Sequence, residues 1–394
     1  MKSPVYGPCL AFSVGICLSL WCGNILSQEK SAAPKNPAKS ESVEDLFPIP
    51  DGTAKDLFAF IEKVQETPLP ADRQTREASI AFFKAQIAAV LAACDAIDAL
   101  KPDPESQVRA LEERFNAYQN LAQVDESANQ KLSGLVTSLK DDPRPAVKRL
   151  VAGYQLEART PGFFRLDDKQ QQQLIQDLLA YMDAYGIDST SYAVATGLGD
   201  ALEMSSTPQM GAPIFDRLAK ELKKTGDPRA AAQIARYEGI ARRLNLPGKF
   251  MELKGTTVDG EEFDWNAYRG KVVLVDFWAS WCGPCRAEIP NMKAQLEKYG
   301  DKGFAIVGIN LDQTKDAYAA YVEREEISWE NLMSQDENER SWNHPLAVHY
   351  GVGGIPMAIL VDRQGKVVSL SARGEELNQL LNNLLGDSRK LGAE

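Results

Sequence analysis

Three short apolar runs in the C-terminal part of the chain constrain its fold more than any other feature. The runs are Val272–Val275, Phe304–Ile309 and Met357–Val361, and they are rich in β-branched residues. Such runs are typical of central strands that are covered on both faces. Because stretches long enough for helices separate them, the pattern predicts an α/β sheet with crossover connections.

The segments around these runs complete the prediction. A turn at Asp362–Gly365 leads into residues 366–371, which we expect to pair with residues 357–361 as a β-hairpin. The expected helices are Pro284–Tyr299, Asp316–Glu325 and Gly374–Leu385. Residues 247–394 are therefore predicted to form one α/β domain.

Residues 51–246 follow a helical pattern instead. Apolar residues recur at steps of three and four, for example along the stripe from Ile80 to Ile97. Breakers that contain proline or glycine, such as Lys101–Pro104 and Gly226–Pro228, separate these stripes. We predict an all-α domain of six to eight helices in a bundle or irregular array, in which Cys94 is a buried small apolar side chain.

The N-terminal residues have the pattern of an export segment. Lys2 precedes an apolar run from Cys9 to Trp21, as in a secretory signal peptide. Residues 1–27 are therefore expected to be a signal peptide, with an uncleaved membrane anchor as the alternative. Both alternatives place the rest of the protein outside the cytoplasm. Residues 28–50 are poor in apolar side chains and predict a disordered linker.

The charge of the chain excludes some functions. The formal net charge is −11 at pH 7. A general nucleic-acid binder would need a basic face, so no nucleic-acid partner is expected. The negative charge also disfavours adhesion to an anionic membrane surface.

Three cysteines, Cys94, Cys282 and Cys285, remain once the export segment is set aside. An exported fold held together by disulfides would carry more of them, in even number. A structural zinc site needs four ligands, and the chain has one C-x-x-C pair and two histidines, so no metal is expected. A purely structural disulfide across so short a loop would restrict the unfolded chain little.

The position of the pair favours redox chemistry instead. Cys282 follows a predicted buried strand and precedes a predicted helix, and Pro284 suits the first turn of that helix. The unpaired amides and the dipole of a helix start stabilise a thiolate, here on Cys282. Cys285 lies one turn further on and should be shielded, as a resolving thiol would be.

The segment Val275–Cys285 resembles the active site of the thioredoxin superfamily, and the fuller pattern resembles its TlpA/ResA-like, extracytoplasmic branch of redoxins and thiol–disulfide oxidoreductases. The further matching positions are Gly260, Gly270–Lys271, Arg286–Pro290 and Gly351–Pro356. The resemblance covers about Pro247 to Leu385 and leaves the helical residues unassigned. It implies a thioredoxin-like domain with a central mixed sheet and flanking helices, and no cofactor.

The same resemblance implies roles for individual residues. Cys282 would attack, Cys285 would resolve, and the two would form a redox-active disulfide. Pro356 would be in the cis form, and the backbone at Ile355 would present an edge to an extended substrate segment. The substrate-binding residues expected on this basis are Trp281, Gly283, Pro284, Ile355 and Pro356.

Two carboxylates compete for the proton-transfer role. Asp276 lies inside the apolar strand, where a charge is costly unless it has a task, and it matches the buried acid of thioredoxins. Glu288 matches a carboxylate found near the site in the TlpA/ResA-like branch. In that branch the strand position that Asp276 occupies here is often Asn. We favour Asp276, whose pKa should be raised by burial. Met357 departs from the Thr common in the family, which leaves substrate preference open.

The predicted activity is reduction of protein disulfides outside the cytoplasm, in a bacterial periplasm or cell envelope, with recharging by a membrane-linked thiol donor. The Gly-Pro spacer is that of reducing thioredoxins, whose potential lies near about −270 mV. A thiol peroxidase is an alternative, although the P-x-x-x-T-x-x-C setting it needs is absent. The other alternative is a helical partner-binding adaptor with an accessory redox domain.

Overall fold

The described part of the chain forms two compact units, which meet between residues 155 and 156. The structure is a computed structural model, and it describes residues 46–71, 73, 75–203 and 205–386. The predicted signal peptide or anchor over residues 1–27 lies outside the described residues, as does the linker up to residue 45. The predicted division near residue 246 falls inside the second unit, which joins several helices to the α/β part of the chain.

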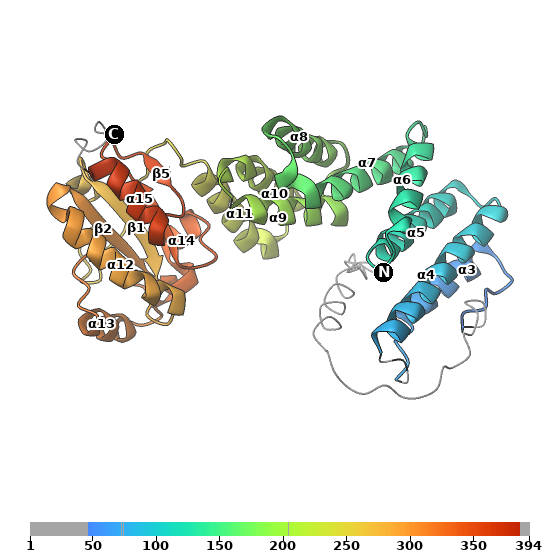
Figure 1. The fold of residues 1–394 in the computed structure, drawn as a ribbon, viewed down its shortest axis with the longest axis horizontal. Helices are drawn as coiled ribbons and strands as arrows, with labels where there is room; N and C mark the ends of the chain where they lie inside the picture. Colours follow the sequence, from blue (N-terminus) through green and yellow to red (C-terminus); the bar gives the residue numbers. More distant parts are fainter. Residues whose placement is uncertain (1–45, 72, 74, 204, 387–394) are drawn as a thin grey trace, which may run out of the picture. The chain divides into compact units, whose positions relative to one another are not determined.

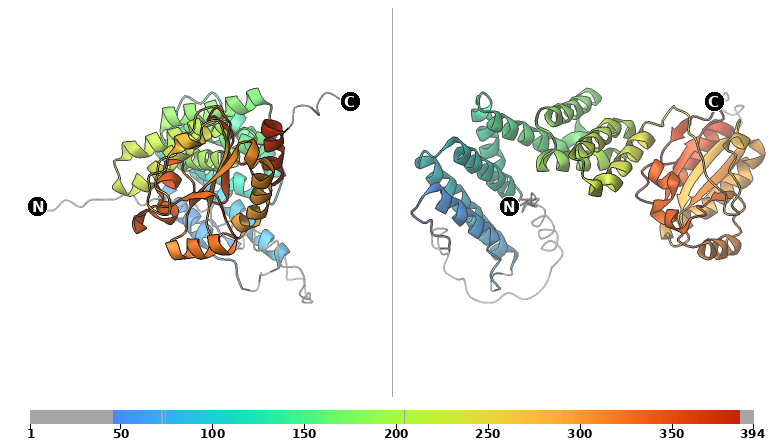
Figure 2. Two further views of the ribbon diagram at one scale, coloured as in Figure 1. Left: turned by 90° about the vertical axis from the view of Figure 1, so that its left-hand side faces the viewer. Right: turned by 180° about the vertical axis from the view of Figure 1, so that it is seen from behind.

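The first unit consists of helices that pack side by side in chain order (Figures 1 and 2). They are α3 (Ala54–Glu66), α4 (Arg76–Ala99), α5 (Pro104–Ala122), α6 (Ser127–Leu139) and most of α7 (Pro145–Arg159), which continues past the boundary at residue 155. Side-chain caps mark the starts of α3, α4 and α5: for example, Thr53 and Asp56 form a capping box before α3, and Asp103 accepts from two backbone amides at the start of α5.

Helix α4 carries the core of this unit. Ala93, Cys94 and Ile97 are fully buried against α3 and α5, and burial raises the pKa of the Cys94 thiol to about 12. The prediction that Cys94 is a buried apolar side chain is confirmed. Among the described residues, α4 is also the one helix long and apolar enough to cross a membrane, but its apolar side chains are those that build this core.

The second unit begins with further helices. They are α8 (Asp168–Tyr185), α9 (Ser189–Glu203), α10 (Ala212–Thr225) and α11 (Ala231–Leu244). Over the described residues from 54 to 244 there are nine α-helices, so the predicted number of six to eight is too low. One reason is the turn at residues 123–126, which separates α5 from α6 without proline or glycine. Asp125 makes this turn by accepting from the backbone amide and hydroxyl of Ser127.

The α/β part of the second unit contains a five-stranded sheet with the order β3-β2-β1-β4-β5. The strands are β1 (Val272–Trp278), β2 (Phe304–Asn310), β3 (Glu330–Leu332), β4 (Met357–Val361) and β5 (Val367–Ser369). β1, β2 and β3 are parallel to one another, whereas β4 is antiparallel to β1 and β5 is antiparallel to β4. All seven residues of the central strand β1 are buried.

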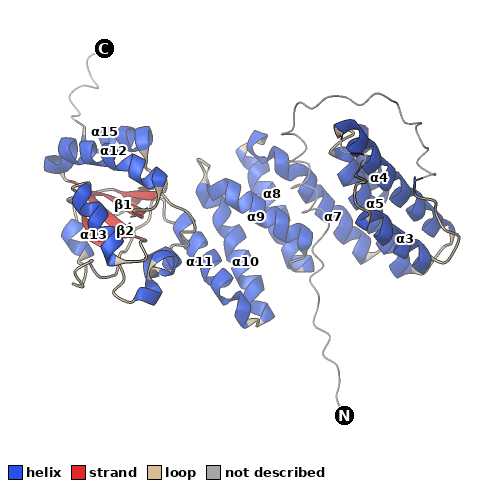
Figure 3. Cartoon of the chain, turned by 90° about the horizontal axis from the view of Figure 1, so that it is seen from below, coloured by secondary structure: helices blue, strands red, loops and turns tan. Residues whose placement is uncertain are grey.

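Helices cover both faces of this sheet. α12 (Gly283–Tyr299) and α15 (Gly374–Leu385) lie together on one face, and α13 (Lys315–Arg324) lies on the other (Figure 3). α14 (Pro345–His349) precedes β4. The mixed sheet with flanking helices is a thioredoxin-like domain, which confirms the predicted fold class. The short strand β3 was not predicted, because its three residues carry no apolar run.

Candidate active site

The junction between β1 and α12 holds the two cysteines. β1 ends at Trp278, and Cys282 is the N-cap residue of α12. Cys282 and Cys285 are buried and joined by a disulfide, and the Cys285 backbone amide donates to Cys282 Sγ at 3.2 Å. The Cys282 sulfur therefore lies where the first amides and the dipole of α12 favour negative charge.

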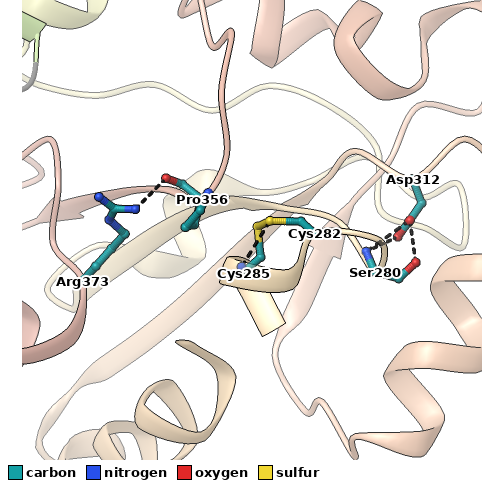
Figure 4. The surroundings of a disulfide bond; sticks show 6 residues. All are labelled: Ser280, Cys282, Cys285, Asp312, Pro356 and Arg373. Atoms are coloured by element: carbon teal, nitrogen blue, oxygen red, sulfur yellow. Dashed lines mark hydrogen bonds between the residues drawn. A yellow bond between two sulfur atoms is a disulfide. The ribbon is translucent and has the colours of Figure 1, made fainter. Parts of the chain in front are cut away.

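The turn that delivers Cys282 is held by a residue that the sequence analysis missed. Asp312 is fully buried and accepts three bonds from Ser280, namely two from the backbone amide at 3.1 and 3.2 Å and one from the hydroxyl at 2.7 Å. Asn310, the last residue of β2, donates a further bond to the same carboxylate. Figure 4 shows Asp312 beside Ser280, next to the disulfide. The available signal was Asn310 and Asp312, two polar residues on either side of Leu311 that follow the apolar run 304–309.

The peptide bond between Ile355 and Pro356 is cis, which is the form that the resemblance implied. Met357 begins β4 and is paired with Phe277, near the end of β1. The cis bond therefore lies at the same edge of the sheet as the end of β1, from which the chain continues to the disulfide (Figure 4). Arg373 donates to the Pro356 carbonyl at 3.2 Å, so this segment is also tied to the start of α15.

Asp276 is buried in β1 between its partners Gly308 and Ala358. Burial, and to a lesser degree the negative charge of Glu288, raise the pKa of the Asp276 carboxyl to about 7, whereas the positive charge of Arg373 acts in the opposite direction. The carboxyl can therefore take up or release a proton near neutral pH, as a general acid or base must.

Glu288 connects two helices. Its side chain is half-buried on α12, and its carboxylate accepts from the Gly374 backbone amide at 2.9 Å. Gly374 is the first residue of α15, whose N-cap residue Arg373 makes no side-chain cap. The carboxylate of Glu288 therefore caps α15, at the positive end of the helix dipole.

An exposed aromatic pair lies beside Cys282. Trp281 and Trp342 are 54% and 42% exposed, although large aromatic side chains are mostly buried. Their rings meet edge to face with centroids 6.1 Å apart. Trp342 was missed by the sequence analysis, because it comes from a loop some sixty residues away along the chain.

The loop that presents Trp342 is firmly anchored. Arg340 is 7% exposed and donates to the carbonyls of Ser334 and Gln335. Ser341, between Arg340 and Trp342, has a φ of 57°, which is uncommon for a residue other than glycine. His344 follows; its ring accepts from the Leu346 amide at the start of α14, and burial lowers its pKa to about 4. The hydrogen bonds of Arg340 and His344 on either side of it thus hold the indole of Trp342 next to Trp281.

The remaining predicted site residues lie at the same edge. Gly283 and Pro284 are exposed in the first turn of α12, and Ile355 is half-buried. Among the described residues, no three His, Cys, Asp or Glu side chains are grouped as metal ligands would be. The site therefore consists of a disulfide, a buried acid, a second carboxylate and an exposed surface around Cys282.

Comparison with known proteins gives matches to the α/β part of the chain. A model of the AhpC/TSA family matches residues 247–370. The thiol-disulfide oxidoreductase ResA of Bacillus thuringiensis (strain Al Hakam) is 30% identical over 130 residues, which are 33% of this chain and 70% of that protein. ResA of Bacillus subtilis (strain 168) is 25% identical over 139 residues, which are 35% of this chain and 72% of that protein.

Two solved structures are also matched by the α/β part of the chain. The thioredoxin domain of a thiol-disulfide oxidoreductase from Bacteroides vulgatus is 28% identical, with a TM-score of 0.32, over 35% of this chain and 97% of that one. A thiol:disulfide interchange protein from Bacteroides sp. is 28% identical, with a TM-score of 0.33, over 36% and 93% of the two chains.

A thioredoxin-like sheet with a Cys-x-x-Cys disulfide at the start of a helix defines an oxidoreductase that works on thiols and disulfides. Within this class of oxidoreductases, the similarity to ResA over 70% of that protein indicates the particular family. The chain belongs to the ResA-like thiol-disulfide oxidoreductases of the thioredoxin superfamily. The matched family model begins at residue 247, so the helices before it are an addition that these matches do not cover.

Proposed function

We propose that this protein reduces protein disulfides outside the cytoplasm through a dithiol formed by Cys282 and Cys285. The observation that carries the proposal is the position of Cys282 Sγ at the N-terminus of α12, where it accepts from the Cys285 amide. A thiolate at this position is stabilised relative to the thiol, and the thiolate is the form that attacks disulfides. The N-terminal apolar segment supports the location.

The reaction proceeds in two exchange steps. The Cys282 thiolate attacks one sulfur of the substrate disulfide, so that a mixed disulfide forms and the other substrate sulfur leaves as a thiolate. Cys285 then loses its proton and attacks Cys282 Sγ, which releases the second substrate sulfur. Two electrons and two protons pass to the substrate, and the enzyme is left with the disulfide seen in the structure. A membrane-linked thiol donor would return it to the dithiol.

Asp276 is the proposed acceptor of the Cys285 proton. A pKa of about 7 lets its carboxylate exist near neutral pH, while burial keeps it a stronger base than an exposed carboxylate. Glu288 is assigned a supporting role, because its charge contributes to that pKa and its carboxylate is engaged by Gly374.

The substrate is proposed to bind as an extended segment against the backbone at Ile355, next to Pro356. Exposed surface at Trp281, Gly283 and Pro284 lies at the same edge of the sheet. An extended protein segment fits this arrangement, because main-chain pairing gives affinity and the exposed aromatic surface accepts apolar side chains.

Trapping of the mixed disulfide tests the mechanism. The substitution Cys285→Ser removes the resolving thiol and should leave substrate proteins covalently attached to Cys282, as detected on non-reducing gels and by mass spectrometry. Cys282→Ser is the matched control and should trap nothing. If Cys285→Ser captures no protein while the wild type reduces insulin at full rate, the two-step mechanism is wrong.

A measured potential tests the direction of electron flow. Equilibration with glutathione or dithiothreitol should give a value in the reducing range of thioredoxin, near about −270 mV. A potential above about −150 mV would mean that the pair acts as an oxidant. Peroxide consumption that persists in Cys285→Ser would instead favour the thiol peroxidase of the redoxin group.

A further inference from the structure

Helix α11 packs against the segment that leads to the cis-proline. Both belong to the second compact unit, and α11 is in contact with α14 and with the residues that follow it. The chain runs from α14 (Pro345–His349) through Gly351 to the cis bond at Pro356 within seven residues of the end of α14. The helical addition therefore reaches a segment next to the proposed substrate edge.

The contact is made backbone to backbone at two glycines. A Cβ atom on Gly239 of α11 would lie 2.4 Å from the Gly351 nitrogen and 2.6 Å from the Val348 carbonyl oxygen. A Cβ atom on Gly351 would lie 2.2 Å from the Ile240 nitrogen. Gly351 also has a φ of 59°, which favours glycine. The two segments approach as closely as their main chains allow, and neither position has room for a methyl group.

Arginines of α11 flank this contact and bind carbonyls at the C-terminal end of α14. Arg243 is 2% exposed and donates to the Tyr350 carbonyl at 2.9 Å, and its charge is paired with Glu203 at 2.6 Å. Arg242 donates to the His349 carbonyl. Carbonyls at a helix C-terminus lack partners within the helix, so cations there are favourable. A guanidinium this deeply buried is costly unless it is paired and hydrogen-bonded, as Arg243 is here through Nε and Nη2.

The contact continues towards the cis bond. The Arg236 guanidinium lies beside Gly353, where a Cβ atom would be 3.5 Å from Arg236 Nη2. Gly353 is two residues before Ile355, whose backbone is the proposed edge for the substrate. α11 thus lies beside the chain from Val348 to Gly353, just before that edge.

We propose that α11 positions the loop 350–356 for substrate binding, so that Gly239, Arg242 and Arg243 are positioning residues for the reaction. This inference rests on the proposed function, because it concerns the edge on which a protein disulfide binds. Displacement of the loop would weaken the pairing of an extended protein substrate. It would leave the chemistry of Cys282 intact, because Cys282 is carried by β1 and α12.

Two substrates of different size test the inference in the full chain. The substitution Gly239→Ala places a methyl group against Gly351, and we expect kcat/KM for insulin disulfides to fall about 10- to 100-fold, mainly through KM. The rate with the small disulfide 5,5′-dithiobis(2-nitrobenzoate) should not change, because it needs no extended edge. Gly197→Ala is the matched control: it is also a glycine within a helix, and a Cβ atom there meets nothing within 4 Å.

A second pair of variants covers the case in which Gly239→Ala does not fold. Arg242 is exposed, so Arg242→Ala should fold and should show the same selective loss with insulin, which Arg242→Lys should partly restore. Equal loss with both disulfides, or no loss in a folded variant, would overturn the positioning role. If the wild type itself fails to reduce insulin but reacts with the small disulfide, the proposed function is wrong, and the inference falls with it.

Discussion

Replacement of Asp276 by asparagine should make the protein more stable and less active. The carboxyl is buried in the central strand, and its pKa is raised from 3.8 to about 7. Between these two pH values the folded state keeps the proton that the unfolded state has lost. The contribution of Asp276 to the free energy of unfolding is therefore at its most favourable below pH 3.8, and it is lost as the pH rises towards 7. An amide of the same shape does not ionise and escapes this loss.

The magnitude follows from the size of the shift. A difference of about three pKa units corresponds to roughly 4 kcal/mol in the free energy of unfolding. Asp276→Asn should thus match the wild type near about pH 4 and exceed it by up to roughly 4 kcal/mol at about pH 8. Because proteins are stable by only about 5–15 kcal/mol, this is a large effect.

The assay is guanidinium-induced unfolding of the oxidised protein at both pH values. Tryptophan fluorescence reports selectively on the α/β part, because five of the six tryptophans lie between Trp265 and Trp342. The transition midpoint of Asp276→Asn should move to higher denaturant as the pH rises, relative to the wild type. If the difference between the two transition midpoints did not change with pH, or if the variant were less stable than the wild type at pH 8, the raised pKa would be refuted.

The activity of the same variant shows whether the Asp276 carboxyl takes part in catalysis or only affects stability. Loss of a general base should slow resolution of the mixed disulfide by about 10²- to 10⁴-fold. The wild-type rate of this step should rise with pH through a midpoint near 7, and the variant should lack that midpoint. A more stable variant that resolves the mixed disulfide at the wild-type rate would remove Asp276 from the mechanism.

The other predictions concern neighbouring residues. Glu288→Gln should move the Asp276 midpoint to lower pH and Arg373→Met should move it to higher pH, because the two charges act in opposite directions; the pH–rate profile measures both. Asp312→Ala should lower the unfolding free energy by roughly 2 to 4 kcal/mol, because the amide and hydroxyl of Ser280 lose their acceptor; unchanged denaturation would contradict this. Trp342→Ala should lower kcat/KM for insulin about two- to tenfold and leave a small disulfide unaffected; equal effects on both would exclude a role in substrate binding.

The α/β part could be predicted well because its signals are local. A strand that is buried on both faces needs a continuous apolar run, and the three longest strands each have one. The position of the cysteine pair between β1 and α12 follows directly from that pattern. β3 has no such run and owes its place to pairing with β2. The number of helices before residue 247 was underestimated because turns such as that at Asp125 use side-chain acceptors instead of proline or glycine.

The site was only partly predictable, since several of its contacts join distant segments. Asp276 could be singled out because a charge inside an apolar run is unusual. Asp312, Trp342 and Arg373 gave no comparable signal, because each acquires its partner only when the sheet has formed. The close approach of Gly239 and Gly351 is likewise invisible in the sequence, where both are ordinary glycines.

The start of α15 links Asp276, the proposed proton acceptor, to the proposed substrate edge. Gly374 donates to Glu288, and its neighbour Arg373 donates to the carbonyl of Pro356. The charges of Glu288 and Arg373 both act on the pKa of Asp276, in opposite directions. The dipeptide Arg373–Gly374 thus holds the carboxylate that raises this pKa and contains the guanidinium that lowers it. That guanidinium is also hydrogen-bonded to Pro356, which ends the proposed substrate edge. Movement of Pro356 would therefore move Arg373. The pKa of Asp276 thus depends on the hydrogen bond between Arg373 and Pro356, which also ties down the proposed substrate edge.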